Sequence, residues 1–132
     1  MSAPATRPEG ATLAITFLYF RDLGAAARFY EGVLGLPLAI DQGWSRIYRL
    51  AGGAHVGLVD EAKGAHRASE TKAVQLCLRV PDVDAWHDWA AARGVAGLTP
   101  VRESAGLGIR VFTFEDPEGH QIEIQTPLRE RA

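Results

Sequence analysis

The sequence predicts an α+β protein built from two βαβββ modules. Each half of the chain opens with an apolar strand, continues through an aspartate into an amphipathic helix, and ends in three further strand segments. The two helix starts align at a constant offset of 60 positions (82 − 22 = 60), so that Asp22, Leu23, Ala25 and Phe29 fall on Asp82, Val83, Ala85 and Trp89. Two copies are too few for a solenoid and indicate a duplicated unit.

In the first half, apolar, β-branched and aromatic residues predict a strand at 13–20. Asp22 is placed to cap a helix, and Gly35 to end it in a left-handed conformation. The apolar stripe of this helix is Ala26, Phe29, Tyr30, Val33 and Leu34. Three more strands are expected at 38–41, 44–50 and 54–59.

The second half opens with a strand at 73–80, in which apolar residues alternate with Gln75, Cys77 and Arg79. Asp82 or Asp84 is expected to cap the second helix, and Gly94 to end it. The buried side of this helix is predicted to be Val83, Trp86, Trp89 and Ala90, which makes both tryptophans core residues. The remaining strands are expected at 98–102, 109–114 and 121–125.

The boundaries follow from composition. The first ten residues contain two prolines and no apolar stretch, so residues 1–11 are expected to form a flexible tail. A charged, small-residue segment at 61–72 is predicted to link the first module, residues 12–60, to the second, residues 73–127. Residues 128–132 are expected to form a C-terminal tail.

Overall composition excludes several classes of function. With 132 residues, 47% of them hydrophobic, the chain is expected to form a compact globular protein and has no apolar run long enough to span a membrane. A net charge of −2 gives no general electrostatic reason to bind nucleic acid or an anionic membrane. The lone Cys77 excludes an intrachain disulfide and a cysteine-cluster zinc site, and a cytoplasmic location is therefore expected.

The segment 114–125 predicts a β-hairpin, because Asp-Pro-Glu-Gly at 116–119 is a turn sequence between two apolar runs. Beyond the turn, Gln121, Glu123 and Gln125 alternate with isoleucines and so share one face. The earlier segment 55–59 can be laid on 121–125, with Gly57 where Glu123 stands.

With the segments 20–23, 28–36 and 114–123 in view, the chain resembles the vicinal oxygen chelate superfamily, which includes glyoxalase I, extradiol dioxygenases, and fosfomycin and bleomycin resistance proteins. The resemblance covers about residues 12–127 and implies a glyoxalase/bleomycin-resistance/dioxygenase-type fold, with the two βαβββ modules around a shared cleft. It does not name an activity, because one fold hosts many chemistries.

In metal-dependent relatives a divalent ion sits in the cleft, and the resemblance places its ligands at Ile15, Gly57, Gln75 and Glu123. Only Gln75 and Glu123 carry side-chain oxygens, whereas a hard ion prefers about six oxygen ligands. No cofactor is therefore predicted, and a divalent metal at Gln75 and Glu123 is kept as the weaker alternative.

Each candidate site residue has two readings. Glu123 could act as a general base, or could pair with Arg79 or Arg110. Gln75 could bond a ligand carbonyl, or satisfy backbone groups. His55 shares the cleft face and is the one histidine considered for ligand binding, while His66, His87 and His120 are expected to be solvated.

The predicted cleft has two different walls. One is hydrophobic, with Ile15, Phe17, Tyr19 and Val59; the other is polar, with Gln75, Cys77, Arg79, Gln121, Glu123 and Gln125. Such a site suits a small amphipathic or aromatic organic molecule, with Cys77 as an unreactive lining residue. The alternatives are a divalent-metal-dependent lyase, isomerase or dioxygenase with a rearranged site, and an ancillary binding module. A homodimer is expected, because relatives commonly pair modules across a twofold axis.

Overall fold

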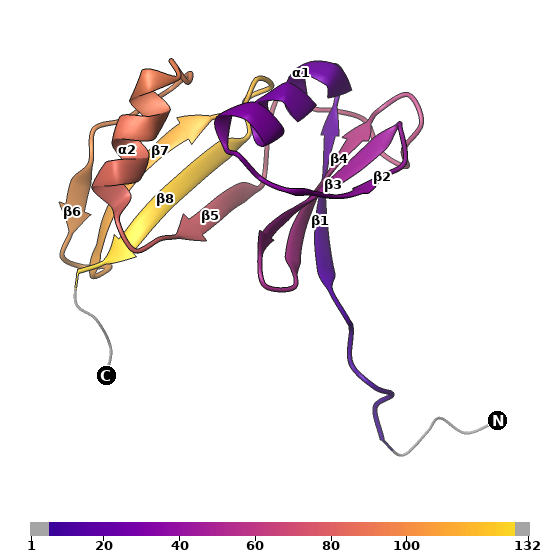
Figure 1. Cartoon of the computed structure of the whole chain (residues 1–132), viewed down its shortest axis with the longest axis horizontal. Coiled ribbons are helices and arrows are strands. Elements are labelled where there is room, and N and C mark those ends of the chain that lie inside the picture. Colours follow the sequence, from indigo (N-terminus) through magenta and orange to yellow (C-terminus); the bar gives the residue numbers. More distant parts are fainter. Residues whose placement is uncertain (1–5, 129–132) are drawn as a thin grey trace.

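The computed structural model describes residues 6–128 and contains the two predicted modules (Figure 1). The first consists of β1 (Ala14–Phe20), α1 (Leu23–Arg28) with a π-helical turn η1 (Phe29–Val33), β2 (Leu38–Asp41), β3 (Ser45–Ala51) and β4 (Ala54–Asp60). The second consists of β5 (Gln75–Arg79), α2 (Val83–Ala92), β6 (Arg102–Ser104), β7 (Ile109–Glu115) and β8 (Gln121–Pro127). Residues 61–74 between them form turns and bends.

The two sheets have the same topology. Their strand orders are β1-β4-β3-β2 and β5-β8-β7-β6. In each sheet the first and last strands pair in parallel and the other neighbours pair antiparallel. This equivalence confirms the duplicated βαβββ unit.

The helix ends confirm most of the predicted signals. The Asp22 carboxylate accepts a hydrogen bond from the Ala25 backbone N–H at 3.0 Å, and Asp82 does the same for Ala85 at 3.1 Å, so Asp82 is the cap of α2. Gly35, with φ of +68°, follows the first helix in the left-handed conformation.

One strand was predicted in the wrong place. The sequence suggested a strand at 98–102, whereas β6 is Arg102–Ser104. Thr99 instead bonds the edge of β7, with its backbone N–H donating to Thr113 O at 3.0 Å and its hydroxyl accepting from Thr113 N at 2.8 Å. The segment before β6 thus follows β7 without forming a regular strand.

The predicted tails, 1–11 and 128–132, lie partly outside the described residues. Within residues 6–128, none of the helices has the length and apolar character needed to cross a membrane.

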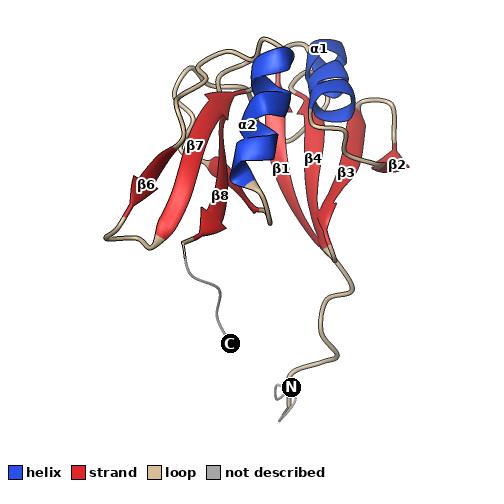
Figure 2. Ribbon diagram, turned by 60° about the vertical axis from the view of Figure 1, so that its left-hand side comes forward, coloured by secondary structure: helices blue, strands red, loops and turns tan. Residues whose placement is uncertain are grey.

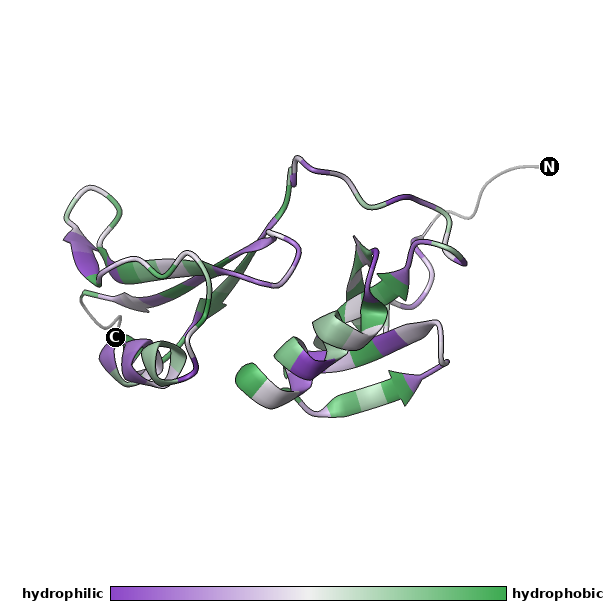
Figure 3. Ribbon diagram, turned by 90° about the horizontal axis from the view of Figure 1, so that it is seen from above, coloured by the Kyte–Doolittle hydropathy of each residue, from purple (hydrophilic) through white to green (hydrophobic). Residues whose placement is uncertain are grey.

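The helix-facing sides of both sheets share one hydrophobic core. Leu18, Phe20 and Tyr30 of the first module belong to the same buried cluster as Phe112 and Ile124 of the second. In Figure 2, α2 lies next to α1, and Figure 3 shows the two modules side by side from above. The modules are therefore joined through their helix-facing sides, and their other faces stay outside this core.

The β7–β8 turn is the second link between the modules. Asp116, only 3% exposed, accepts hydrogen bonds from the Tyr30 hydroxyl at 2.9 Å, from the His120 ring Nδ1 at 2.8 Å, and from the backbone of Glu118 and His120. Burial, and then the charge of Asp116, raise the pKa of Tyr30. The prediction that His120 is solvated was wrong: its side chain packs against Phe20.

Glu118 in the same turn reaches the start of α1. Its carboxylate accepts from the backbone N–H groups of Arg21 at 2.9 Å and Asp22 at 2.8 Å. An acidic group there also complements the helix dipole. The first helix is thus stabilised by a residue of the second module.

Candidate functional site

The open face of the second sheet carries a row of bonded polar side chains. Parallel pairing of β5 with β8 sets Gln75 beside Gln121, Cys77 beside Glu123, and Arg79 beside Gln125. Because directly paired residues point to the same face, all six side chains lie together. The structure thus brings together every predicted residue of the polar wall.

Glu123 is the centre of this row. Its carboxylate accepts from Gln125 Nε2 at 2.6 Å, from Gln75 Nε2 at 3.4 Å, and from the Cys77 thiol at 3.5 Å. The Gln125 amide turns its oxygen to Arg79, whose Nε and Nη2 donate to it at 2.9 and 2.6 Å. The Glu123 carboxylate is therefore linked to Arg79 only through the side-chain amide of Gln125.

Arg110 was the other arginine considered as a partner for Glu123, and this pairing was wrong. Arg110 lies on the helix-facing side and forms ion pairs with Asp84 at 2.8 Å and Glu103 at 3.5 Å. The hydrogen bond from Arg110 holds the pKa of Asp84 below its usual value. With that arginine engaged elsewhere, the charge of Glu123 remains available on the open face.

Cys77 is an exposed residue, yet the surroundings of its partly buried thiol disfavour the thiolate. Burial of the sulfur, followed by the charge of Glu123 and its hydrogen bond, raises the pKa of Cys77, while Arg79 acts in the opposite direction. Because the thiolate is the nucleophilic form, this environment favours a protonated lining residue.

The open face of the first sheet is hydrophobic. Phe17 is 46% exposed, and its ring lies directly over Gly57: a Cβ at Gly57 would come within 2.5 Å of the ring. Tyr19 makes an edge contact with His66, with ring centroids 5.2 Å apart. His55 is buried, and its Nδ1 lies 3.0 Å from Gly53 O, so this ring nitrogen is already engaged.

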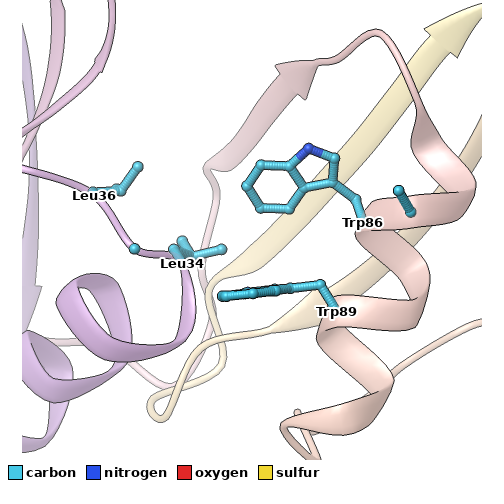
Figure 4. Close-up of a pocket in the computed structure, with 6 residues that line it drawn as sticks. Leu34, Leu36, Trp86 and Trp89 are labelled. Atoms are coloured by element: carbon cyan, nitrogen blue, oxygen red, sulfur yellow. The ribbon is translucent and has the colours of Figure 1, made fainter.

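A third region, which the sequence did not indicate, is a pocket of about 530 Å³ between the end of the first helix and α2. Leu34 and Leu36 line one side, and Trp86 and Trp89 project from α2 toward them (Figure 4). The prediction that both tryptophans are core residues was wrong for Trp89, which is 42% exposed. Helical spacing correctly placed both rings on one side of α2, but could not show that this side borders a gap between modules.

Of the two remaining histidines predicted to be solvated, one is exposed and the other is packed. His66 is exposed, as expected. His87 is not simply solvated: its Nε2 lies 3.0 Å from Thr99 O and its ring packs edge-on against Phe112, 4.9 Å between centroids. Its position indicates a structural role between α2 and the second sheet.

A family profile described as the Glyoxalase/Bleomycin resistance protein/Dioxygenase superfamily matches residues 12–124, which span both modules. The chain belongs to this superfamily. No curated protein matches the sequence.

Solved structures of the superfamily fold are similar over nearly the whole chain. A glyoxalase/bleomycin resistance protein/dioxygenase from Nocardioides has a TM-score of 0.74 at 20% identity, covering 97% of this chain and 89% of its own. TnmS3, an antibiotic-binding protein from Streptomyces sp. CB03234, has a TM-score of 0.71 at 24% identity, covering 92% and 99%. A lactoylglutathione lyase from Agrobacterium tumefaciens has a TM-score of 0.69 at 23% identity, covering 91% and 96%. At these identities the likeness shows the fold alone.

The metal positions implied by the superfamily resemblance do not form a complete donor set here. Gln75 and Glu123 adjoin each other, but Ile15 and Gly57 have no side-chain donor, and the Phe17 ring fills the space above Gly57. Among residues 6–128, no three His, Cys, Asp or Glu side chains gather closely enough to hold an ion. These residues do not fit the divalent ion of metal-dependent superfamily members.

The four positions come together as two pairs, one on each sheet. Ile15 and Phe17 meet Gly57, and Gln75 meets Glu123. Across the described part of the chain, no hydrogen bond or aromatic contact links the hydrophobic wall to the polar wall. The shared cleft therefore remains a prediction for this superfamily member.

Proposed function

We propose that this protein binds a small amphipathic or aromatic organic molecule between its two open sheet faces, without a complete metal site. The proposal rests on the contrast between the two open faces. The first carries an exposed phenylalanine ring, Phe17, and on the second Glu123 and Gln75 are held in position by hydrogen bonds. A ring offers stacking for an apolar body, and a fixed carboxylate and amide offer bonds for a polar end.

The side chains of the polar face are ordered in advance of any ligand. Arg79 fixes the amide of Gln125, and Gln125 fixes one oxygen of Glu123. Held in this way, Glu123 loses little further conformational entropy when it accepts a hydrogen bond from a ligand. The proposed binding role for Gln75, Cys77 and Arg79 is to shape this face around Glu123.

We further propose that the protein acts as a homodimer, in which the hydrophobic face of one copy meets the polar face of the other. Within one chain the modules join through their helix-facing sides, which leaves both open faces available to a second copy. Light scattering in solution tests this assembly, and a monomer would contradict it. A cytoplasmic location belongs to the same proposal and rests on the single cysteine.

The similar folds of an antibiotic-binding protein and of a lactoylglutathione lyase are consistent with either a binder or an enzyme. The second candidate is a divalent-metal-dependent lyase, isomerase or dioxygenase, and the adjoining oxygens of Gln75 and Glu123 are the observation in its favour. Glu123 would then be the catalytic residue, as a general base or as a ligand.

A thermal-shift screen tests the proposed binding, because anything that prefers the folded form raises the melting midpoint, and elemental analysis separates the two candidates. Small aromatic amines and amides, which can donate a hydrogen bond to Glu123, are expected to raise it, and Phe17→Ala and Glu123→Gln are expected to remove the effect. Elemental analysis of the purified protein should find less than one divalent ion per chain. A stoichiometric ion that is lost in Glu123→Gln would instead support the metal-dependent enzyme.

A further inference from the structure

The pocket between the two modules is separate from the open faces and has a different chemistry. Its lining consists of Leu34, Gly35, Leu36, Ala85, Trp86 and Trp89. None of these side chains is charged. The volume of about 530 Å³ lies within the range of about 300–1,000 Å³ that is typical of small-molecule sites.

Trp89 is an exposed ring held in a fixed position. Its indole N–H donates to Val33 O at 2.6 Å, across the gap between the modules. The Arg93 guanidinium carbon lies 3.1 Å from the centre of the ring. These contacts restrain the side chain although 42% of its surface is exposed, so a ligand would meet a pre-positioned aromatic surface.

The second indole is turned differently. In Figure 4 the ring of Trp86 is seen face-on and that of Trp89 nearly edge-on, with the leucines opposite. Two aromatic surfaces in different orientations and an aliphatic wall suit a flat ring that stacks on one indole and meets the edge of the other.

We propose that this pocket is a binding site for a neutral, planar aromatic molecule of about two fused rings. The absence of charge in the lining disfavours an anion, since an anionic group there would lose hydration without gaining a partner. A cation is disfavoured for a different reason: the Arg93 guanidinium already lies against the Trp89 ring and would repel a second positive charge. The pocket is bordered by η1 and α2, so a bound ligand would contact both modules. This site does not depend on the open faces or on Glu123.

The experiment uses N-phenyl-1-naphthylamine, a neutral probe whose fluorescence rises in an apolar site, with the full chain. Ala85→Leu places a larger side chain in the pocket, on an exposed position of α2. Ala92→Leu is the matched control, because it makes the same substitution on the same helix, also exposed but outside the lining. Ala85→Leu is expected to weaken probe binding about tenfold, and Ala92→Leu to leave it within about twofold.

Two further measurements keep the outcomes separate. Phe17→Ala, on the open face, should leave probe affinity unchanged; if it removes binding while Ala85→Leu does not, the probe sits on the open face, and the pocket proposal fails while the proposed function stands. If Ala85→Leu instead changes the molecular mass by light scattering, a second copy of the chain occupies the pocket, which also overturns the proposal. Equal effects of the two leucine substitutions overturn it as well.

Discussion

The two modules share a backbone and differ in what they place on it. Phe17 opposite Gly57 in the first sheet corresponds to Cys77 opposite Glu123 in the second, and both pairs lie in parallel β ladders. The helix-facing sides of both sheets are apolar, as a common core requires. The comparison shows that strand register fixes where a side chain lies, while the open faces are free to diverge chemically, one toward rings and the other toward a carboxylate.

The largest contrast lies in the turns that precede the last strand of each module. Asp116 in the second module is buried and accepts bonds from Tyr30 and His120, whereas the first module has the short turn at Gly52 and Gly53. Asp116→Ala would leave the Tyr30 hydroxyl and the His120 ring without their acceptor. A loss of about 3 kcal/mol in the free energy of unfolding is expected, measured by urea denaturation.

The matched change in the first module is Gly52→Asn. Gly52 has φ of +51°, and asparagine tolerates this region better than most residues. Its effect should stay below about 1 kcal/mol. Similar losses for Asp116→Ala and Gly52→Asn would show that the buried carboxylate does not distinguish the modules.

The second prediction concerns Gly57, the position equivalent to Glu123. A Cβ there would lie 2.5 Å from the Phe17 ring, too close without movement of one of them. Gly57→Ala should therefore destabilise the protein by about 1–3 kcal/mol. In the double variant Phe17→Ala with Gly57→Ala the steric part of this loss should disappear, so the cycle should be non-additive. Additive losses would mean that the ring does not block this position.

The third prediction tests the link between the modules at α1. Both helices have an aspartate cap, but α1 also receives the carboxylate of Glu118. Glu118→Ala should lower the free energy of unfolding by about 1 kcal/mol, less in high salt because the charge acts partly through the helix dipole. Glu118→Gln keeps one acceptor oxygen and should lose less. If both variants unfold like the unchanged protein, solvent satisfies the start of α1 equally well.

The sequence predicted the elements well because their signals are local. An aspartate at each helix start, glycine at each end, and alternation in β5 and β8 are fixed by neighbouring residues, and parity correctly placed Gln75, Cys77, Arg79 and Glu123 on one face. The same reasoning misplaced β6, because the Thr99 hydroxyl bonds β7 in a way that no periodicity reveals.

What the sequence missed depends on how the modules meet. The exposure of Trp89, the burial of His120 and the reach of Glu118 to α1 all arise at the contact between modules, which residue spacing does not encode. A signal existed for the burial of His120: Asp116 and His120 are four residues apart around a Pro-Glu-Gly turn, a spacing that allows their side chains to meet. The pocket at the module boundary carries no such local sign.

The last prediction compares the two charges that flank Cys77 and has the smallest effect on stability. The negative charge of Glu123 raises the pKa of the thiol and the positive charge of Arg79 lowers it. Glu123→Gln should therefore lower the pKa of Cys77 and make alkylation by iodoacetamide severalfold faster near pH 8, while Arg79→Gln should raise that pKa and slow the reaction. The rate measured against pH reports only this site, because the chain has one cysteine. Burial is the first cause of the raised pKa and persists in both variants, so neither substitution should return the pKa of Cys77 to its ordinary value. The free energy of unfolding of Glu123→Gln should change by less than about 0.5 kcal/mol. Alkylation rates that change in the same direction in both variants would show that packing around the sulfur, and not the charge of Glu123, controls the reactivity of Cys77.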